Sequence, residues 1–208
     1  MKKLLILLAV LIGAFLVYKN FFKKDEPKRD EPKPIAVSKH SDAFNESIEK
    51  ILDDYYAMHG GFVNWDSTTV NSSATNLKNS LDNFNTDELK KDSVIYQTVL
   101  FPLDNAKNNV ALVIAAADWM GKRRALQDLS DNLRNILQVV KYDRAVVYWQ
   151  ECPMAFGDGM SGNWLSNKEE VVNPYLGNKD PKYGSTMLNC GETKMKIDFT
   201  APDSTGNK

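Results

Sequence analysis

Residues 118–140 read DWMGKRRALQDLSDNLRNILQVV, and their periodicity predicts an amphipathic helix. Large apolar side chains recur three or four residues apart, which places them on one face of a helix. These side chains are Leu126, Leu129, Leu133, Ile136, Leu137 and Val140. Asp118 stands at the start of the segment, where a carboxylate can accept hydrogen bonds from the first free backbone N–H groups. A helix with one apolar face must bury that face, so the segment predicts helical neighbours.

Two segments with the same kind of signal lie nearer the N-terminus. Residues 41–61 begin with a serine and an aspartate and end with Gly60 and Gly61, a pair typical of a helix C-terminus. A second segment follows Asp66, which can cap its first turn. The predicted inward face of this second helix consists of Val70, Ala74, Leu77, Leu81 and Phe84.

A third segment, residues 92–117, is apolar enough to lie at the centre of a helical protein. Pro102 lies within it, and a proline inside a helix is expected to kink it or to split it in two. Four amphipathic helices with short connections pack most simply as an antiparallel up-down bundle. The sequence therefore predicts a mainly α fold, with a four-helix bundle over residues 41–144.

The pattern changes after this helical region. Residues 145–149 are β-prone and aromatic, and glycine, asparagine and proline then interrupt short apolar pieces. We expect a small strand-and-loop extension over residues 145–200, packed on the bundle and too small to fold independently. Residues 201–208 are expected to be a disordered tail.

The N-terminus has the pattern of an export signal. Lys2 and Lys3 precede fourteen consecutive apolar residues, and no small-x-small cleavage site follows them. We therefore expect residues 1–22 to be an uncleaved signal anchor or transmembrane helix, which places the domain in the periplasm at the inner membrane. The alternative is secretion after signal cleavage. Residues 23–40 are rich in proline and charge, which is typical of an extended tether, and His40 at its end is expected to be solvated.

Charge and composition exclude several classes of protein. The net charge of −1 leaves no surplus of lysine and arginine for phosphate contacts, so we expect no nucleic-acid partner. Two cysteines and two histidines exclude a multi-bridge disulfide framework and a zinc finger built from closely spaced cysteines and histidines. No nucleophile elbow, P-loop or dinucleotide motif is present, and we expect the protein not to be an enzyme.

Each cysteine has a methionine close by. Cys152 is followed two residues later by Met154, and Met187 precedes Cys190 by three residues. Two thiolate–thioether pairs brought together would form a four-sulfur site, and such ligands select soft ions, above all Cu(I) or Ag(I). His59 is a possible additional ligand.

A second interpretation involves no metal. In an oxidising compartment Cys152 and Cys190 can form a disulfide, and Met154 and Met187 are then ordinary core residues. The protein would be a non-catalytic envelope interaction or scaffold module. His59 would cap the last carbonyls of its helix.

Four short runs in the extension carry a family resemblance. They are CPMA at 152–155, NWLS at 163–166, NPYLG at 173–177 and MLNCG at 187–191. Together they resemble the bacterial family named domain of unknown function 3347, which also occurs fused to periplasmic adaptor subunits of copper/silver efflux pumps. Residues 122–124, Lys-Arg-Arg, are similar to its helical part and are expected to be an exposed helix start. The resemblance covers about residues 41–197.

The resemblance implies an exported helical domain with a heavy-metal role. On that basis Cys152, Met154, Met187 and Cys190 are the expected ligands, and components of a heavy-metal efflux system are the expected partners beside the membrane. We expect no fused pump-adaptor domain in this chain, and residues 157–162 look like an insertion. The resemblance thus implies a membrane-tethered Cu(I)- or Ag(I)-binding protein linked to copper homeostasis or efflux.

Overall fold

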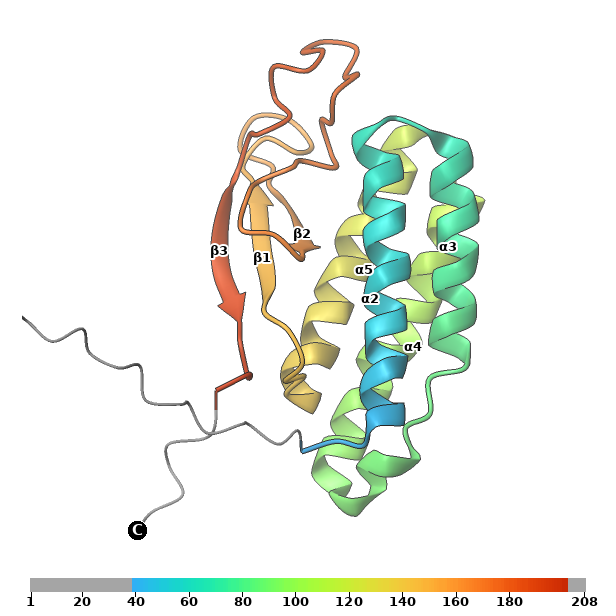
Figure 1. The fold of residues 1–208 in the computed structure, drawn as a ribbon. Helices are drawn as coiled ribbons and strands as arrows, with labels where there is room; N and C mark the ends of the chain where they lie inside the picture. Colours follow the sequence, from blue (N-terminus) through green and yellow to red (C-terminus); the bar gives the residue numbers. More distant parts are fainter. Residues whose placement is uncertain (1–38, 202–208) are drawn as a thin grey trace, which may run out of the picture. The chain divides into compact units, whose positions relative to one another are not determined.

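The computed structural model of the protein describes residues 39–201 (Figure 1). The predicted anchor, most of the tether and most of the tail lie outside these residues. The described part contains four α-helices, a short 3-10 helix η1 (Asp87–Lys91) and one small sheet. The helices are α2 (Asp42–Val63), α3 (Ser67–Asp82), α4 (Ser93–Ala115) and α5 (Trp119–Val140). The prediction of a mainly helical protein is confirmed.

Each helix begins at a side chain that accepts hydrogen bonds from its first turn. Ser41 accepts from the backbone N–H of Phe44 at the start of α2, and Asp118 accepts from that of Gly121 at the start of α5. Asp66 and Asp92 make two such bonds each at α3 and α4. Each of these caps contributes about 1 kcal/mol by satisfying N–H groups that have no partner inside the helix.

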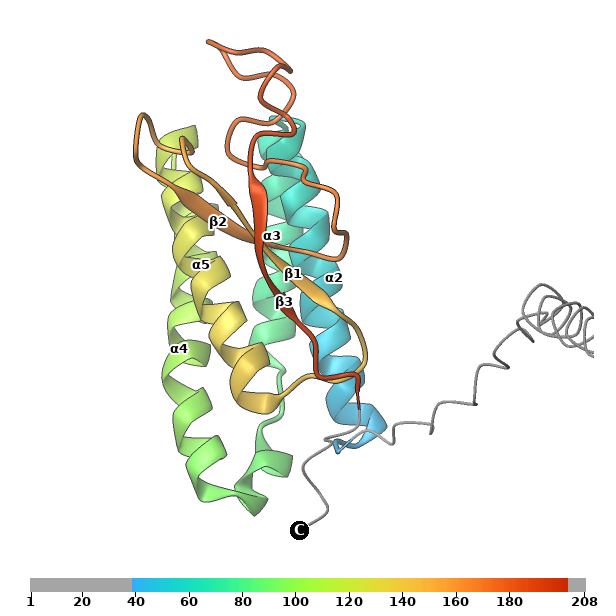
Figure 2. The same cartoon turned by 90° about the vertical axis from the view of Figure 1, so that its left-hand side faces the viewer.

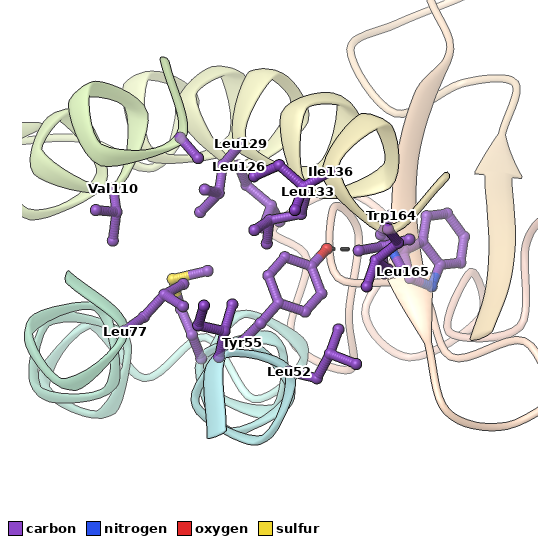
Figure 3. Close-up of a cluster of buried hydrophobic side chains, with 14 of the residues drawn as sticks. Leu52, Tyr55, Leu77, Val110, Leu126, Leu129, Leu133, Ile136, Trp164 and Leu165 are labelled. Atoms are coloured by element: carbon purple, nitrogen blue, oxygen red, sulfur yellow. Dashed lines mark hydrogen bonds between the residues drawn. The ribbon is translucent and has the colours of Figure 1, made fainter. Parts of the chain in front are cut away.

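The predicted apolar faces form one core. Consecutive helices pack against one another, and Leu77 of α3 and Leu126 and Leu129 of α5 have no exposed surface. Figure 3 shows these side chains converging from several helices on one interior. Within residues 39–201, no helix combines the length and the hydropathy needed to cross a membrane.

The predicted end of the first helix is wrong. Helix α2 continues past Gly60 and Gly61 to Val63. A Cβ atom at Gly61 would lie 2.9 Å from the backbone nitrogen of Val70, so this glycine permits a close approach of α3 rather than ending α2. Tertiary packing accounts for Gly61, which the sequence pattern alone assigned to a C-cap together with Gly60.

The predicted break at Pro102 is also absent. Helix α4 runs without interruption from Ser93 to Ala115 with Pro102 inside it. The proline ring is buried, and α4 packs against both α3 and α5. Burial of the ring between neighbouring helices offsets the one backbone hydrogen bond that proline cannot make.

The expectation that the Lys-Arg-Arg segment is exposed holds for Arg124 and is wrong for Lys122 and Arg123. Lys122 is 4% exposed and Arg123 is 7% exposed. The Lys122 ammonium donates hydrogen bonds of 2.7 Å to the Asn71 side chain and to the carbonyl of Val113, one of the last carbonyls of α4. The short α4–α5 connection brings this lysine to the end of α4, and burial lowers its pKa. Arg123 stacks on Trp65 at 4.3 Å.

His40 is not solvated, contrary to the expectation from the sequence. Its ring stacks on Phe44 with 4.5 Å between centroids, and its Nε2 lies 2.7 Å from the carbonyl oxygen of Val140. Its Nδ1 lies 3.1 Å from the Glu88 carboxylate. The end of the predicted tether therefore packs on the helices.

The strand-and-loop extension contains a three-stranded antiparallel sheet in the order β2-β1-β3. Its strands are β1 (Val147–Cys152), β2 (Gly162–Ser166) and β3 (Glu192–Ile197). Strand β2 packs against α5, and Figure 2 shows the sheet lying across the helices. Strand β1 pairs with both neighbours, so the residues that end it are held from two sides.

Substitution of Gly61 and of Gly60 by alanine tests the close approach of α2 and α3. Gly61→Ala is expected to lower the free energy of unfolding by about 1–3 kcal/mol, because the new methyl group would meet the backbone of Val70. Gly60→Ala is the matched control: a Cβ atom there meets nothing within 4 Å. It should raise stability by up to about 1 kcal/mol through helix propensity. Equal effects in denaturant unfolding would contradict the packing described.

Candidate functional site

The structure brings the two cysteines together. Cys152 is the last residue of β1, and Cys190 lies two residues before β3. Their sulfur atoms are 3.2 Å apart and both thiols are free. Strands β1 and β3 pair in a register that sets Glu151 opposite Glu192. The residues that follow Glu151 and those that precede Glu192 therefore lie side by side, and they include the two cysteines. The register of the ladder, which no short-range pattern specifies, positions the thiols.

A close backbone contact holds the second cysteine in place. Gly191 has a φ of +138°, and a Cβ atom there would lie 2.4 Å from the carbonyl oxygen of Glu151. Only glycine fits this combination of backbone conformation and space. The indole of Trp164, which has no exposed surface, also borders this position and shields the region of Cys190 from one side.

Asn173 is a buried residue that fixes the loop carrying Cys190. Its side-chain amide donates a 2.9 Å hydrogen bond to the carbonyl of Cys190, and its backbone N–H donates to that of Leu188. Its side-chain oxygen accepts from the backbone N–H groups of Tyr175 and Leu176. Asn173 belongs to the NPYLG run, but its role was not predicted from the sequence. Its hydrogen-bond partners become its neighbours only in the folded extension.

Tyr175 and Gln127 join the extension to the helices. The Tyr175 hydroxyl donates to the carbonyl of Asn163, and it lies 3.1 Å from the side-chain oxygen of Gln127 on α5. The same Gln127 oxygen accepts from the backbone N–H of Asn163. The β2 strand that pairs beside Cys152 is therefore attached to the bundle by polar contacts as well as by packing.

Each methionine lies in a turn: Met187 shares its turn with Cys190, and the turn of Met154 follows the strand that ends at Cys152. Met154 follows Cys152 in a turn closed by a hydrogen bond from the Gly157 N–H to the Met154 carbonyl. The Cys190 N–H donates a hydrogen bond of 3.0 Å to the carbonyl of Met187 in a second turn. Both methionine side chains are half-buried against the core. Within the described residues, no hydrogen bond joins either thioether to a thiol.

His59 makes a contact that was not predicted from the sequence. It lies inside α2, and its Nε2 is 3.0 Å from the carbonyl oxygen of Val172, so the ring donates to a loop rather than to its own helix. Burial lowers the pKa of His59 to about 4, so the ring is neutral at pH 7. The contact supports the loop that leads to Asn173.

The thiol of Cys190 holds its proton strongly. Burial, with a further contribution from the hydrogen bond to Cys152, raises the pKa of Cys190 to about 11. A thiol of this kind is a poor nucleophile at neutral pH, and a metal ion must displace its proton to bind. In the part of the chain that the structure describes, no three His, Cys, Asp or Glu side chains form a group able to hold a metal ion.

Comparison with protein families identifies the helical region. Residues 51–144 match the model of the family described as Protein of unknown function (DUF3347). The resemblance inferred from the sequence is confirmed over these residues. The matched part runs from within α2 to the connection after α5, whereas the cysteine and methionine runs lie outside it. No curated protein and no solved structure matches the chain.

The protonation of Cys190 is open to direct measurement. We expect the rate of alkylation of this thiol in the reduced protein to rise with pH to a midpoint near 11, because burial disfavours the thiolate. In the Cys152→Ala variant only Cys190 can be alkylated, and the smaller contribution to its raised pKa, the hydrogen bond to Cys152, is absent. The same chain in denaturant should titrate near the ordinary value of 9.0. A midpoint near 9 in the folded protein would contradict the burial described.

Proposed function

We propose that this protein is a membrane-tethered, extracytoplasmic protein that binds Cu(I) or Ag(I). The observation that carries the proposal is the pair of free thiols, with 3.2 Å between the sulfur atoms of Cys152 and Cys190 at the end of β1. Two thiols at contact distance on a fixed scaffold can act together on one soft ion.

The chemistry of the surrounding donors supports a soft monovalent ion. Cys152 and Cys190 would supply thiolate charge, and Met154 and Met187 are the thioethers near them in the sequence. Thiolates and thioethers prefer Cu(I) to hard cations. The protein would bind and release such an ion without being oxidised or reduced itself. His59 fits less well, because its Nε2 is engaged by the carbonyl of Val172.

The surroundings favour a binding function over catalysis. The raised pKa of Cys190 makes its thiol unsuited to nucleophilic attack at neutral pH. The buried indole of Trp164 borders Gly191, so it would place an apolar side chain near an ion bound at Cys190. We propose a non-enzymatic role in which the protein holds the ion and exchanges it with a partner.

The cellular setting of the proposal comes from the sequence. Residues 1–22 would anchor the protein in the inner membrane and residues 23–40 would tether the domain in the periplasm, with secretion after cleavage as the alternative. The helices would be connected as an antiparallel up-down bundle. The resemblance to domains fused to copper/silver efflux adaptors supports components of a heavy-metal efflux system as partners, with no role for nucleic acid.

A Cu(I) titration of the full chain under anaerobic conditions, against a coloured chelator of known affinity, tests the function. The reduced protein is expected to bind one Cu(I), and Cys152→Ser or Cys190→Ser should abolish binding because one thiolate cannot hold the ion against the chelator. Met154→Leu and Met187→Leu should weaken binding. Binding should tighten as pH rises, because the ion displaces the Cys190 proton.

Met160→Leu is the matched control, since Met160 is 52% exposed in the loop between β1 and β2 and belongs to neither pair. It should leave the affinity unchanged. Failure of the reduced wild-type protein to compete with the chelator would overturn the proposal.

The contact between the sulfur atoms of Cys152 and Cys190 also favours a second candidate function, an interaction module stabilised by a disulfide. Sulfur atoms 3.2 Å apart need a small movement to reach the S–S bond length of about 2.0 Å. A bond between Cys152 and Cys190 would close a loop of about 39 residues and stabilise the fold by roughly 4 kcal/mol on the chain-entropy model. Counting free thiols in protein isolated from the envelope separates the two functions, because a disulfide leaves no thiolate for copper.

A further inference from the structure

The outer face of α4 is an apolar surface that the proposed function does not use. The described part of the chain exposes six large hydrophobic side chains, and four of them lie on α4. The most exposed are Phe101 at 74%, Val94 at 72% and Leu112 at 56%. Single exposed apolar residues are normal, but a concentration on one helix indicates an interaction surface.

The spacing of these residues places them in one line along the helix. At about 100° per residue, Val94, Phe101 and Leu112 fall within about 20° of one another. Asn105 and Asn108 fall between Phe101 and Leu112 on the same stripe. The opposite side of α4 faces the core and carries the buried residues Val99, Leu103, Ala106, Val110 and Val113. Figure 2 shows α4 along one edge of the helical region, where its outer side has no neighbouring helix.

The stripe is almost free of charge. Between residues 93 and 117 the sequence contains two charged residues, Asp104 and Lys107. Lys107 reaches toward α3, with its ammonium 3.7 Å from the Asp82 carboxylate. Depletion of charge around exposed aromatic and aliphatic side chains is typical of the centre of a protein–protein interface. A helix that lies on a membrane surface instead carries lysine and arginine beside its apolar face, and α4 has one such residue.

The order of residues along the stripe is symmetric. Phe101 and Leu112 lie at equal distances from the midpoint between Ala106 and Lys107, and so do Asn105 and Asn108. A two-fold interface requires a surface that is complementary to itself, and this pattern meets that requirement.

We propose that the outer face of α4 is the interface between two copies of this chain. The two α4 helices would pack antiparallel about a two-fold axis near Ala106. Phe101 of each copy would then contact Leu112 of the other, and the asparagines would face one another at the centre. The proposal rests on the exposure and order of these residues and is independent of metal binding.

Photo-crosslinking of the full chain in mild detergent tests the interface. A photoreactive phenylalanine analogue replaces Phe101, and two isotopically distinct preparations are mixed before illumination, so that links between copies can be recognised by mass spectrometry. The expected result is a link from position 101 of one copy to the peptide around Leu112 of the other. The same analogue at Met160, which is exposed on another part of the molecule, is the matched control and should give no such link.

Phe101→Glu provides the second measurement. Because Phe101 is 74% exposed, the charge should leave the thermal unfolding of the single chain unchanged while it abolishes the links from a photoreactive group placed at Leu112. The position of the links distinguishes this interface from association through other segments. Links that map elsewhere on a second copy, links to detergent or added lipid alone, or no link between copies would each overturn the proposal.

Discussion

The hydroxyl of Tyr55 is the contact on which the arrangement of the whole molecule depends. It lies on α2 with no exposed surface, accepts a 3.2 Å hydrogen bond from the backbone N–H of Leu165 in β2, and lies 2.7 Å from the hydroxyl of Ser130 on α5 (Figure 3). Ser130 donates in turn to the carbonyl of Leu126, so Tyr55 must donate to Ser130. Burial raises the pKa of Tyr55 to about 12 and keeps this donor protonated. One atom thus joins two helices to the sheet, and its loss would leave buried polar groups without partners.

The thiol pair is placed by this attachment. Once β2 is fixed on the helices, β1 pairs with it and β3 pairs with β1, which brings Cys190 to Cys152. Asn173 and the close backbone contact at Gly191 then hold the second cysteine. A soft metal ion and a disulfide require the same proximity of sulfur atoms, so the contact between the two thiols is compatible with both proposed functions.

Local features of the fold were predictable from the sequence, and features that depend on distant partners were not. The caps at Asp66 and Asp118 and the apolar stripes were predicted, because both follow from residues within one helix. The burial of Lys122 depends on the end of α4, and the role of Gly61 depends on the approach of α3. The contact of the cysteines was a hypothesis from their chemistry, because strand register decides it and no short spacing encodes register.

The most direct test of the proposed metal centre is X-ray absorption spectroscopy at the copper edge on the Cu(I)-loaded full chain. The proposal predicts a first shell made of sulfur alone. In the variant that combines Met154→Leu with Met187→Leu, this shell should contain fewer sulfur atoms while the two cysteine sulfurs remain. Nitrogen or oxygen neighbours in the wild-type protein, or a shell that is the same in the double variant, would contradict a site built from Cys152, Met154, Met187 and Cys190.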